Sequence, residues 1–232
     1  ERLDDAQEVV FYERGIEVIE LKTNMARLKI ASDCRLGEHH VRIRCASGIS
    51  DLRLFYVGPF ASTNEVEPNN EVSKAQAIPL NATVQGASGG EDMDFFQVTA
   101  KKGQPIAIEV EAVRLGRALL DPFISIQRKD GKVLASSDDA PLLAQDSAFS
   151  IVAPEDGDYI VQVRDSTYTG PADTTYRLHV GTFPRPMAVY PPGGKAGEKL
   201  NVQFIGDAAG EFKQEITLPA EPQERFGAFA ER

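Results

Sequence analysis

Carboxylate and amide side chains gather in two short stretches of this chain, and their spacing suits the binding of a hard cation. The first stretch is Glu65-Val66-Glu67-Pro68-Asn69-Asn70, and the second is Glu91-Asp92-Met93-Asp94-Phe95-Phe96. Pro68 favours an extended backbone at Glu67, and residues two apart in an extended chain lie on the same side. We therefore expect Glu65 and Glu67 to present their carboxylates together.

Further oxygen atoms would complete this candidate site. The asparagines supply amide oxygens at a turn, where asparagine tolerates the required dihedral angles, and the two aspartates repeat the i, i+2 spacing. If the stretches meet, carboxylate and amide oxygens suit Ca²⁺, and the candidate ligands are Glu65, Glu67, Asn69, Asn70, Asp92 and Asp94. The alternative is a solvated acidic linker followed by an acidic strand edge, because charge clusters are usually wet surface.

Composition limits the classes of partner. The 232 residues carry a formal net charge of −10, with 42% hydrophobic and 26% charged residues, which is typical of a globular chain with a buried core. No basic stripe is present to neutralise phosphates, so we expect no nucleic-acid partner. No apolar run approaches the ~18 residues of a membrane helix, so we expect no membrane insertion. Residue 1 is Glu rather than Met, which indicates a removed signal peptide or a piece of a longer protein.

Residue types that carry out catalysis are sparse. His39 and His40 are adjacent on an expected strand and therefore point to opposite faces. A Cys–His pair between either histidine and Cys34 or Cys45 is one alternative, and a glycosidase-type carboxylate pair is another, but no motif selects either. The strand between the cysteines would carry them beyond the ~7 Å that a disulfide spans. We therefore predict that the chain is not an enzyme and that both thiols are unpaired.

Short strands separated by turn residues fill the chain. Apolar and charged residues alternate in segments 25–30 and 106–112, the pattern of a strand with one buried face. About eight such strands in the middle of the chain are the count of a jelly-roll sandwich. We expect an all-β chain with an incomplete immunoglobulin-like β-sandwich segment at 1–58, an acidic linker at 59–67, a jelly-roll-like β-sandwich at 68–182 and the start of a further immunoglobulin-like domain at 183–232.

Several short motifs occur in a fixed order between residues 64 and 182. Besides the two acidic stretches, they are Lys102-Gly103-Gln104, Leu120-Asp121-Pro122, Asp130-Gly131-Lys132-Val133-Leu134-Ala135, Asp138-Asp139, Ala153-Pro154-Glu155-Asp156-Gly157-Asp158-Tyr159 and Tyr176-Arg177-Leu178. In this order they resemble the bacterial pre-peptidase C-terminal (PPC) domain, a secreted β-sandwich module. The flanks resemble pieces of immunoglobulin-like domains of the IPT/TIG sort, an arrangement similar to multidomain secreted proteins of planctomycete-type bacteria.

The resemblance implies a calcium site. PPC modules of bacterial collagenases bind paired Ca²⁺ through an acidic segment at the domain entrance and an Asp at a strand start. Carried over by position, the matching residues are Glu65, Glu67, Asn69, Asn70 and Asp94, with Asp92 beside them. The chain departs from the family at Asn70, where Asp is usual, and the missing charge should weaken the site because ligand charge tunes affinity.

The resemblance also implies a function and a location. We expect a non-catalytic structural or interaction module of a larger bacterial protein, stabilised by calcium and secreted, periplasmic or at the cell surface. The alternatives are a collagen- or carbohydrate-binding accessory domain and the non-catalytic part of a secreted peptidase. The expected partners are neighbouring domains of the parent chain and an extracellular protein or glycan. Because the chain has no Trp, Tyr168 is the candidate aromatic contact for such a polymer.

Overall fold

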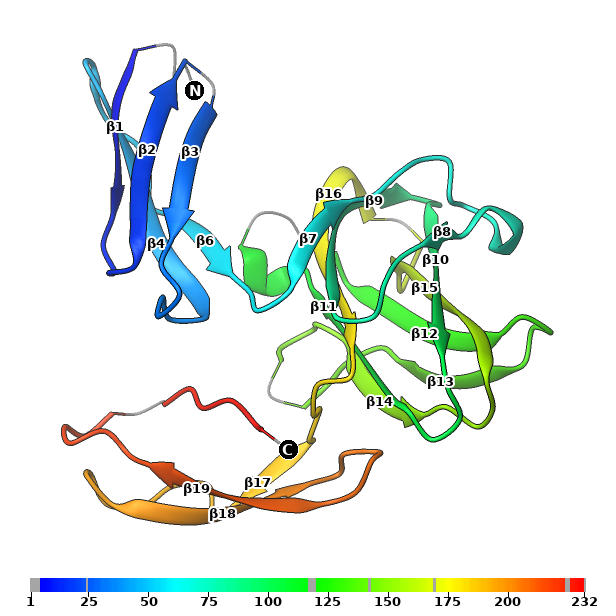
Figure 1. Ribbon diagram of the computed structural model, residues 1–232. Coiled ribbons are helices and arrows are strands. Elements are labelled where there is room, and N and C mark those ends of the chain that lie inside the picture. The colour runs from blue at the N-terminus through cyan, green and yellow to red at the C-terminus, as the bar shows by residue number, and fades with distance from the viewer. Residues whose placement is uncertain are drawn as a thin grey trace. The chain divides into compact units, whose positions relative to one another are not determined.

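The computed structural model is almost entirely β and divides into two compact units, Glu1–Phe60 and Ala61–Arg232 (Figure 1). It describes residues 5–23, 25–116, 120–141, 143–168, 170–223 and 226–231. The helical elements among them are two single 3₁₀ turns, η1 (Val72–Lys74) and η2 (Val113–Leu115). In the part of the chain that is described, no helix is long and apolar enough to cross a membrane. The predicted all-β class is confirmed.

The first unit contains two groups of antiparallel strands. In one group β4 pairs with β1, β5 and β6, and the other group is the hairpin of β2 and β3. The bounds are β1 (Ala6–Phe11), β2 (Ile16–Lys22), β3 (Met25–Ile30), β4 (Gly37–Cys45), β5 (Gly48–Ile49) and β6 (Arg53–Val57). Phe11 and Phe55 pack edge to face with their ring centroids 5.5 Å apart. Among the described residues of this unit, only Cys34 and His39 are buried.

The second unit is built around two five-stranded sheets. One has the order β13-β12-β15-β10-β8 and the other the order β14-β11-β16-β9-β7. Their strands are β7 (Ala61–Asn64), β8 (Gln76–Ala77), β9 (Ala82–Gly90), β10 (Met93–Ala100), β11 (Pro105–Glu111), β12 (Pro122–Arg128), β13 (Val133–Ser137), β14 (Ala148–Val152), β15 (Gly157–Asp165) and β16 (Gly170–Gly181). The short strands β7 and β8 run parallel to their partners, and the other pairs are antiparallel.

The two sheets share one hydrophobic core. Alternate residues of β11, namely Ile106, Ile108 and Val110, enter this core together with Phe96 of β10 and Leu178 of β16, and all five are fully buried. The period of two follows from the pleat, which turns successive side chains to opposite faces. The predicted β-sandwich is therefore present.

The segment expected to be an acidic linker, 59–67, instead contributes a strand. β7 pairs with β9 in a register that runs from Ala61 opposite Ala82 to Asn64 opposite Gln85. The Glu65 amide then donates to the Gln85 carbonyl at 3.0 Å and continues the ladder. The acidic stretch is thus anchored to the sandwich rather than free in solvent.

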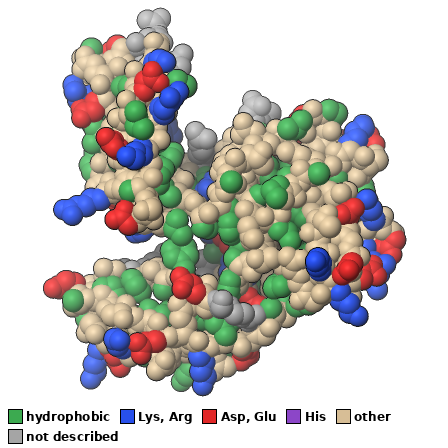
Figure 2. Space-filling view, in the orientation of Figure 1, with side chains coloured by type: hydrophobic (Ala, Val, Ile, Leu, Met, Phe, Trp, Pro, Cys, Tyr) green, Lys and Arg blue, Asp and Glu red, His purple; other side chains and the backbone are tan. Residues whose placement is uncertain are grey.

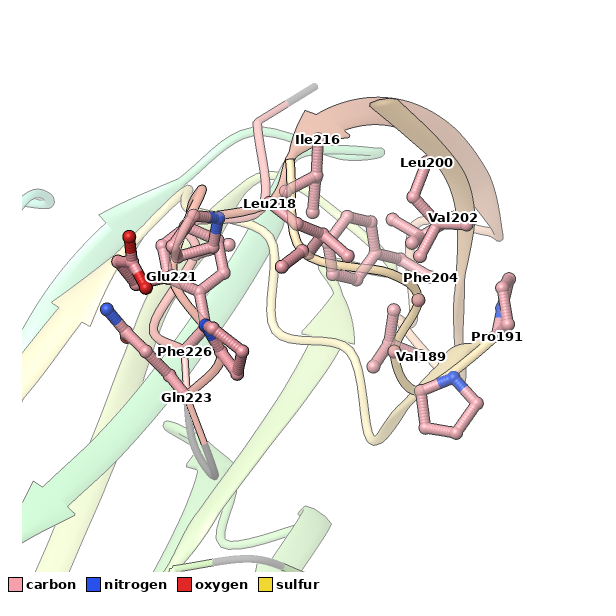
Figure 3. A pocket seen from close by; sticks show the side chains of 17 residues that line it. Val189, Pro191, Leu200, Val202, Phe204, Ile216, Leu218, Glu221, Gln223 and Phe226 are labelled. Carbon is pink, nitrogen blue, oxygen red and sulfur yellow. The ribbon is translucent and has the colours of Figure 1, made fainter. Parts of the chain in front are cut away.

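A smaller three-stranded sheet follows the sandwich. Its strands are β17 (Ala188–Tyr190), β18 (Lys199–Ile205) and β19 (Phe212–Thr217). Phe204 stacks on Phe212 with centroids 5.0 Å apart. An apolar cavity of about 370 Å³ lies against this sheet, and Val202, Leu218 and Phe226 help to line it (Figure 3). The immunoglobulin-like character of this module, and of the first unit, stays a prediction.

Charged side chains are distributed over the surface in both signs. On the face shown in Figure 2, Lys and Arg side chains lie among Asp and Glu side chains rather than in a continuous stripe. Opposite charges also meet in pairs, such as Lys129 with Asp158 at 2.8 Å and Arg128 with Glu155 at 2.7 Å. The visible face therefore offers no extended basic surface.

Candidate metal centre

Three carboxylates converge between the end of β7 and the start of β10. Glu65 and Glu67 follow β7, and Asp94 is the second residue of β10. Each can offer one oxygen, and these oxygens all lie within 4.8 Å of one another. Asp94 is fully buried, Glu65 is half-buried and Glu67 is exposed. The cluster therefore extends from the interior of the sandwich to its surface.

Backbone hydrogen bonds hold the acidic stretch between the two sheets. On one side the Glu65 amide bonds to Gln85 of β9, and on the other the Phe95 amide of β10 donates to the Asn69 carbonyl at 3.1 Å. The Glu67–Pro68 peptide bond between these points is cis. Because β9 and β10 belong to different sheets, the stretch joins the two sheets at the point where its carboxylates meet.

Two buried oxygen atoms in this cluster have no hydrogen-bond donor. The Asn69 side chain is fully buried and donates through Nδ2 to Glu65 Oε1 at 2.8 Å, which leaves its Oδ1 without a partner. Oδ1 of Asp94 is likewise unpartnered. A buried polar atom without a partner costs about 1–3 kcal/mol. Carboxylate and amide oxygens are the ligands of a hard cation such as Ca²⁺, so the donor set of this cluster fits such an ion.

The carboxylates perturb one another electrostatically. Burial, followed by the nearby Glu65 carboxylate, raises the pKa of Asp94 to about 9. Burial also raises the pKa of Asp92, with the charges of Glu67 and Glu65 as the next causes. Like charges in a poorly solvated site favour the protonated form. Asp94 therefore holds a proton at neutral pH unless a bound cation replaces that proton.

Tyr176 on β16 belongs to the cluster, although sequence reasoning assigned it no role there. Its fully buried hydroxyl donates to Asp94 Oδ2 at 2.7 Å and lies 3.2 Å from Glu65 Oε1. Gly86 stands opposite Tyr176 in the β9–β16 register, and a Cβ there would overlap the tyrosine ring. Burial and the Asp94 charge raise the pKa of Tyr176 well above its ordinary value, so the hydroxyl remains a donor.

The other two predicted ligands lie beside the cluster. The exposed Asn70 side chain donates through Nδ2 to Asp92 Oδ1, so these two residues pair with each other. Asp92 does not belong to the group of three converging carboxylates. Of the six residues chosen from the sequence, the fold thus brings Glu65, Glu67 and Asp94 together, with Asn69 against them.

The Cys–His alternative corresponds to a contact inside the first unit. Cys34 Sγ lies 3.8 Å from Nε2 of His39, and that nitrogen is 2.7 Å from the Arg35 carbonyl oxygen. Both side chains are buried, and Cys34 and Cys45 are free thiols. Since His39 already bonds to the backbone, and Cys34 and His39 are the buried residues among those described in this unit, the contact has the character of a packing interaction.

A second acidic group, near the loop before β14, has a structural explanation. Asp146 is fully buried, and its carboxylate accepts hydrogen bonds from the amides of Ala112 and Val113 at 3.0 and 2.8 Å. It also forms an ion pair with Arg114 Nε at 2.5 Å. Asp146 thus fixes the start of η2, and this structural role accounts for its burial.

The solved structures that resemble part of the chain include the following two. The pre-peptidase C-terminal domain of collagenase from Bacillus anthracis is 20% identical, with a TM-score of 0.37 over 46% of this chain and 93% of that one. The periplasmic g-type lysozyme inhibitor PliG of Aeromonas hydrophila is 15% identical, with a TM-score of 0.35 over 52% of this chain and 98% of that one.

Sequence comparison is more specific. A probable subtilase-type serine protease of Deinococcus radiodurans is 34% identical over 100 residues, which are 42% of this chain and 14% of that protein. The chain thus matches only a small part of the length of this relative. Residues 92–165 match the family model of the bacterial pre-peptidase C-terminal domain. The matched segment runs from Asp92, beside the carboxylate cluster, to the end of β15.

Proposed function

We propose that the sandwich is a calcium-stabilised, non-catalytic module of a larger secreted bacterial protein. The observation that carries the proposal is the convergence of the Glu65, Glu67 and Asp94 carboxylates, together with the lack of a hydrogen-bond donor for the buried Oδ1 atoms of Asn69 and Asp94. A PPC segment fits an accessory role, because the family occurs in secreted proteases and collagenases. The work of the module in this proposal is to hold its neighbours in place.

Calcium would act at the entrance of the sandwich. The bound cation would supply positive charge that offsets the repulsion among the carboxylates. Asn69 and Asp94 would turn their unpartnered oxygens to it, while Tyr176 keeps the Asp94 carboxylate oriented through its hydrogen bond. Since the acidic stretch bonds to both β9 and β10, fixing it would tie the two sheets and the preceding chain together.

Thermal unfolding with and without a chelator tests the calcium proposal. Extracellular sites bind with dissociation constants of about 10⁻⁴–10⁻³ M, and Ca²⁺ at a hundred times that value should stabilise the sandwich by about 2.7 kcal/mol. We expect Ca²⁺ to raise the melting temperature of the wild type but not that of Asp94→Asn. Asp158→Asn, which removes an aspartate on β15 that pairs with Lys129, is the matched control and should keep the gain. A wild-type melting temperature that changes neither with Ca²⁺ nor with chelator contradicts the proposal.

Catalysis would then reside in another part of the parent protein. The relative from Deinococcus radiodurans is a probable serine protease of which the matched region is 14%, and this supports an accessory role beside a peptidase. We expect the purified chain to release no peptides from casein. Hydrolysis that disappears in Cys34→Ala would overturn this assignment, because it would make the buried thiol a nucleophile.

A second candidate function is the binding of an extracellular polymer, and one observation favours it. Tyr168 is 44% exposed and has a positive φ of 60°, and its ring lies 4.2 Å from the Arg164 guanidinium carbon. The same guanidinium lies 4.0 Å from the Phe123 ring. A tyrosine fixed in this way could stack on a sugar or a collagenous chain.

Pull-down with insoluble collagen and with polysaccharides tests this second function. Tyr168→Ala should abolish any retention, whereas Tyr190→Ala should preserve it. Tyr190 is a suitable control because it is 69% exposed and lies on β17, outside the sandwich. Equal retention of both variants would remove Tyr168 from the binding surface.

A further inference from the structure

Arg185 contacts both the sandwich and the three-stranded module that follows it. Its side chain forms an ion pair with Glu109 of β11, with Nε 3.0 Å from Oε2 but without the geometry of a hydrogen bond. Its backbone amide donates to Asp207 Oδ2 at 2.6 Å, and Asp207 lies just after β18. One residue of the connecting segment is therefore held from both sides.

Each of these partners is fixed within its own part of the chain. Glu109 also pairs with Arg114 at 2.8 Å, so its carboxylate is held by a second arginine. Asp207 is only 8% exposed, and its other oxygen accepts the Ala209 amide at 2.8 Å. Neither partner is a mobile surface side chain, which means that little side-chain entropy is lost when Arg185 binds them.

A second contact lies beside the first. The Ala208 amide donates to Ser150 Oγ of β14 at 3.1 Å. β14 and β11 are neighbours in one sheet, with Ser150 opposite Ala107 and Glu109 opposite Ala148. The outer face of this sheet thus touches the following module at two points, on two adjacent strands.

The connecting segment itself is stiff and partly shielded from water. Proline fixes φ on either side of Arg185, at Pro184 and Pro186. The ion-paired side chains of Arg185 and Glu109 are 15% and 18% exposed, and partly buried pairs are screened by salt much less than exposed ones. A flexible tether would not require an arginine shielded to this degree.

We propose that the outer face of the β14–β11 sheet around Glu109 and Ser150 is a docking surface for the β17–β19 module, with Arg185 as the clamp. The sandwich and this module then move as one rigid body. The clamp shares no residue with the carboxylate cluster, so it does not rest on the calcium proposal, although it deepens the proposed role of holding neighbouring domains.

Residual dipolar couplings of the full chain test the clamp. In wild type, couplings from the sandwich and from β17–β19 should fit a single alignment tensor. In Arg185→Ala and in the isosteric Glu109→Gln, the single-tensor fit should fail, because the two parts then reorient separately. Arg128→Ala, which removes an arginine paired with Glu155 elsewhere on the sandwich, should keep the wild-type fit.

Two results would overturn the clamp. The first is a wild type whose two parts require different tensors, and the second is a common tensor that survives both substitutions. Amide spectra of each variant show whether both parts remain folded, and Glu109→Gln leaves the connecting segment unaltered. Adding a chelator should not change the wild-type tensor, so failure of the calcium proposal would be seen separately, in the melting temperature.

Discussion

The sandwich and the first unit are built from similar alternating strands, yet only the sandwich buries a continuous core. Its core cluster extends in sequence from Ile78 to Val180 and takes residues from both sheets. Among the described residues of the first unit, burial is confined to Cys34 and His39. Alternation makes a strand amphipathic, but a core also needs an opposing layer of comparable extent. Alternation is therefore sufficient to predict strands but not to predict a buried core.

The largest effect is expected from a large-to-small substitution in the sandwich core. Phe96 is fully buried, so Phe96→Ala should cost about 3–5 kcal/mol through lost burial and the cavity left behind. Phe11→Ala in the first unit removes a half-buried ring and should cost at most about 2 kcal/mol. Chemical denaturation followed by amide spectra of each unit measures both. Equal losses in the free energy of unfolding would contradict the difference in core packing between the two regions.

The next effect concerns the pH dependence of the sandwich without metal. Asp94 has a folded pKa of about 9, far above the value of about 4 for an unfolded chain. The folded state therefore binds the extra proton, and stability should fall as pH rises from about 4 through about 9. Asp94→Asn cannot lose this proton, so much of that slope should vanish.

Denaturant melts in chelator at a series of pH values measure this slope. Asp158→Asn serves as the control, because it removes a carboxylate without touching the cluster, and it should retain the wild-type slope. If Asp94→Asn and wild type lose stability in parallel between pH 5 and pH 9, Asp94 does not carry the buried proton.

A smaller effect is expected at the buried histidine of the first unit. His39 is fully buried and bonds to the Arg35 carbonyl oxygen at 2.7 Å. His39→Ala should cost about 1–3 kcal/mol, and only the first unit should be affected, because the contact lies within it. His40→Ala is the matched control on the same strand, since that side chain is 40% exposed. A sandwich destabilised by His39→Ala would contradict the independence of the two regions.

The smallest effect is expected at a surface pair. Lys199 and Glu215 pair at 3.1 Å across β18 and β19, with side chains 68% and 52% exposed. Exposed pairs contribute about 0–1 kcal/mol, so Lys199→Ala should leave the unfolding of this module almost unchanged. Point substitutions typically cost ~1 kcal/mol. A loss of about 2 kcal/mol or more in the free energy of unfolding would therefore show that this sheet depends on its surface charges.

Strands with clear alternation could be predicted from the sequence almost residue by residue. The predicted segment 25–30 is β3, and the predicted segment 106–112 differs from β11 by one residue at each end, because period-two patterning is a local property. β7 could not be predicted, since Ala61, Ser62, Thr63 and Asn64 show no alternation and are all exposed. Its strand conformation comes from parallel pairing with β9, which local sequence does not encode.

The candidate site likewise contains residues that could be predicted from local sequence and residues that could not. Glu65 and Glu67 share a short acidic stretch, so their proximity follows from local spacing. Tyr176 lies 82 residues from Asp94 and reaches it only because β16 pairs with β9 beside the small Gly86. Such partners depend on sheet topology, and the two unpartnered buried oxygens became visible only with the fold.

Terbium luminescence tests the central claim, that the carboxylate cluster holds a cation, most directly. The chain has no Trp, so tyrosine must sensitise Tb³⁺, and the Tyr176 hydroxyl lies against Asp94 and Glu65. We predict saturable emission in wild type that Ca²⁺ displaces, emission lost in Asp94→Asn, and emission retained in Asp158→Asn. Absence of saturable emission in wild type, or equal emission in all three proteins, would contradict the account.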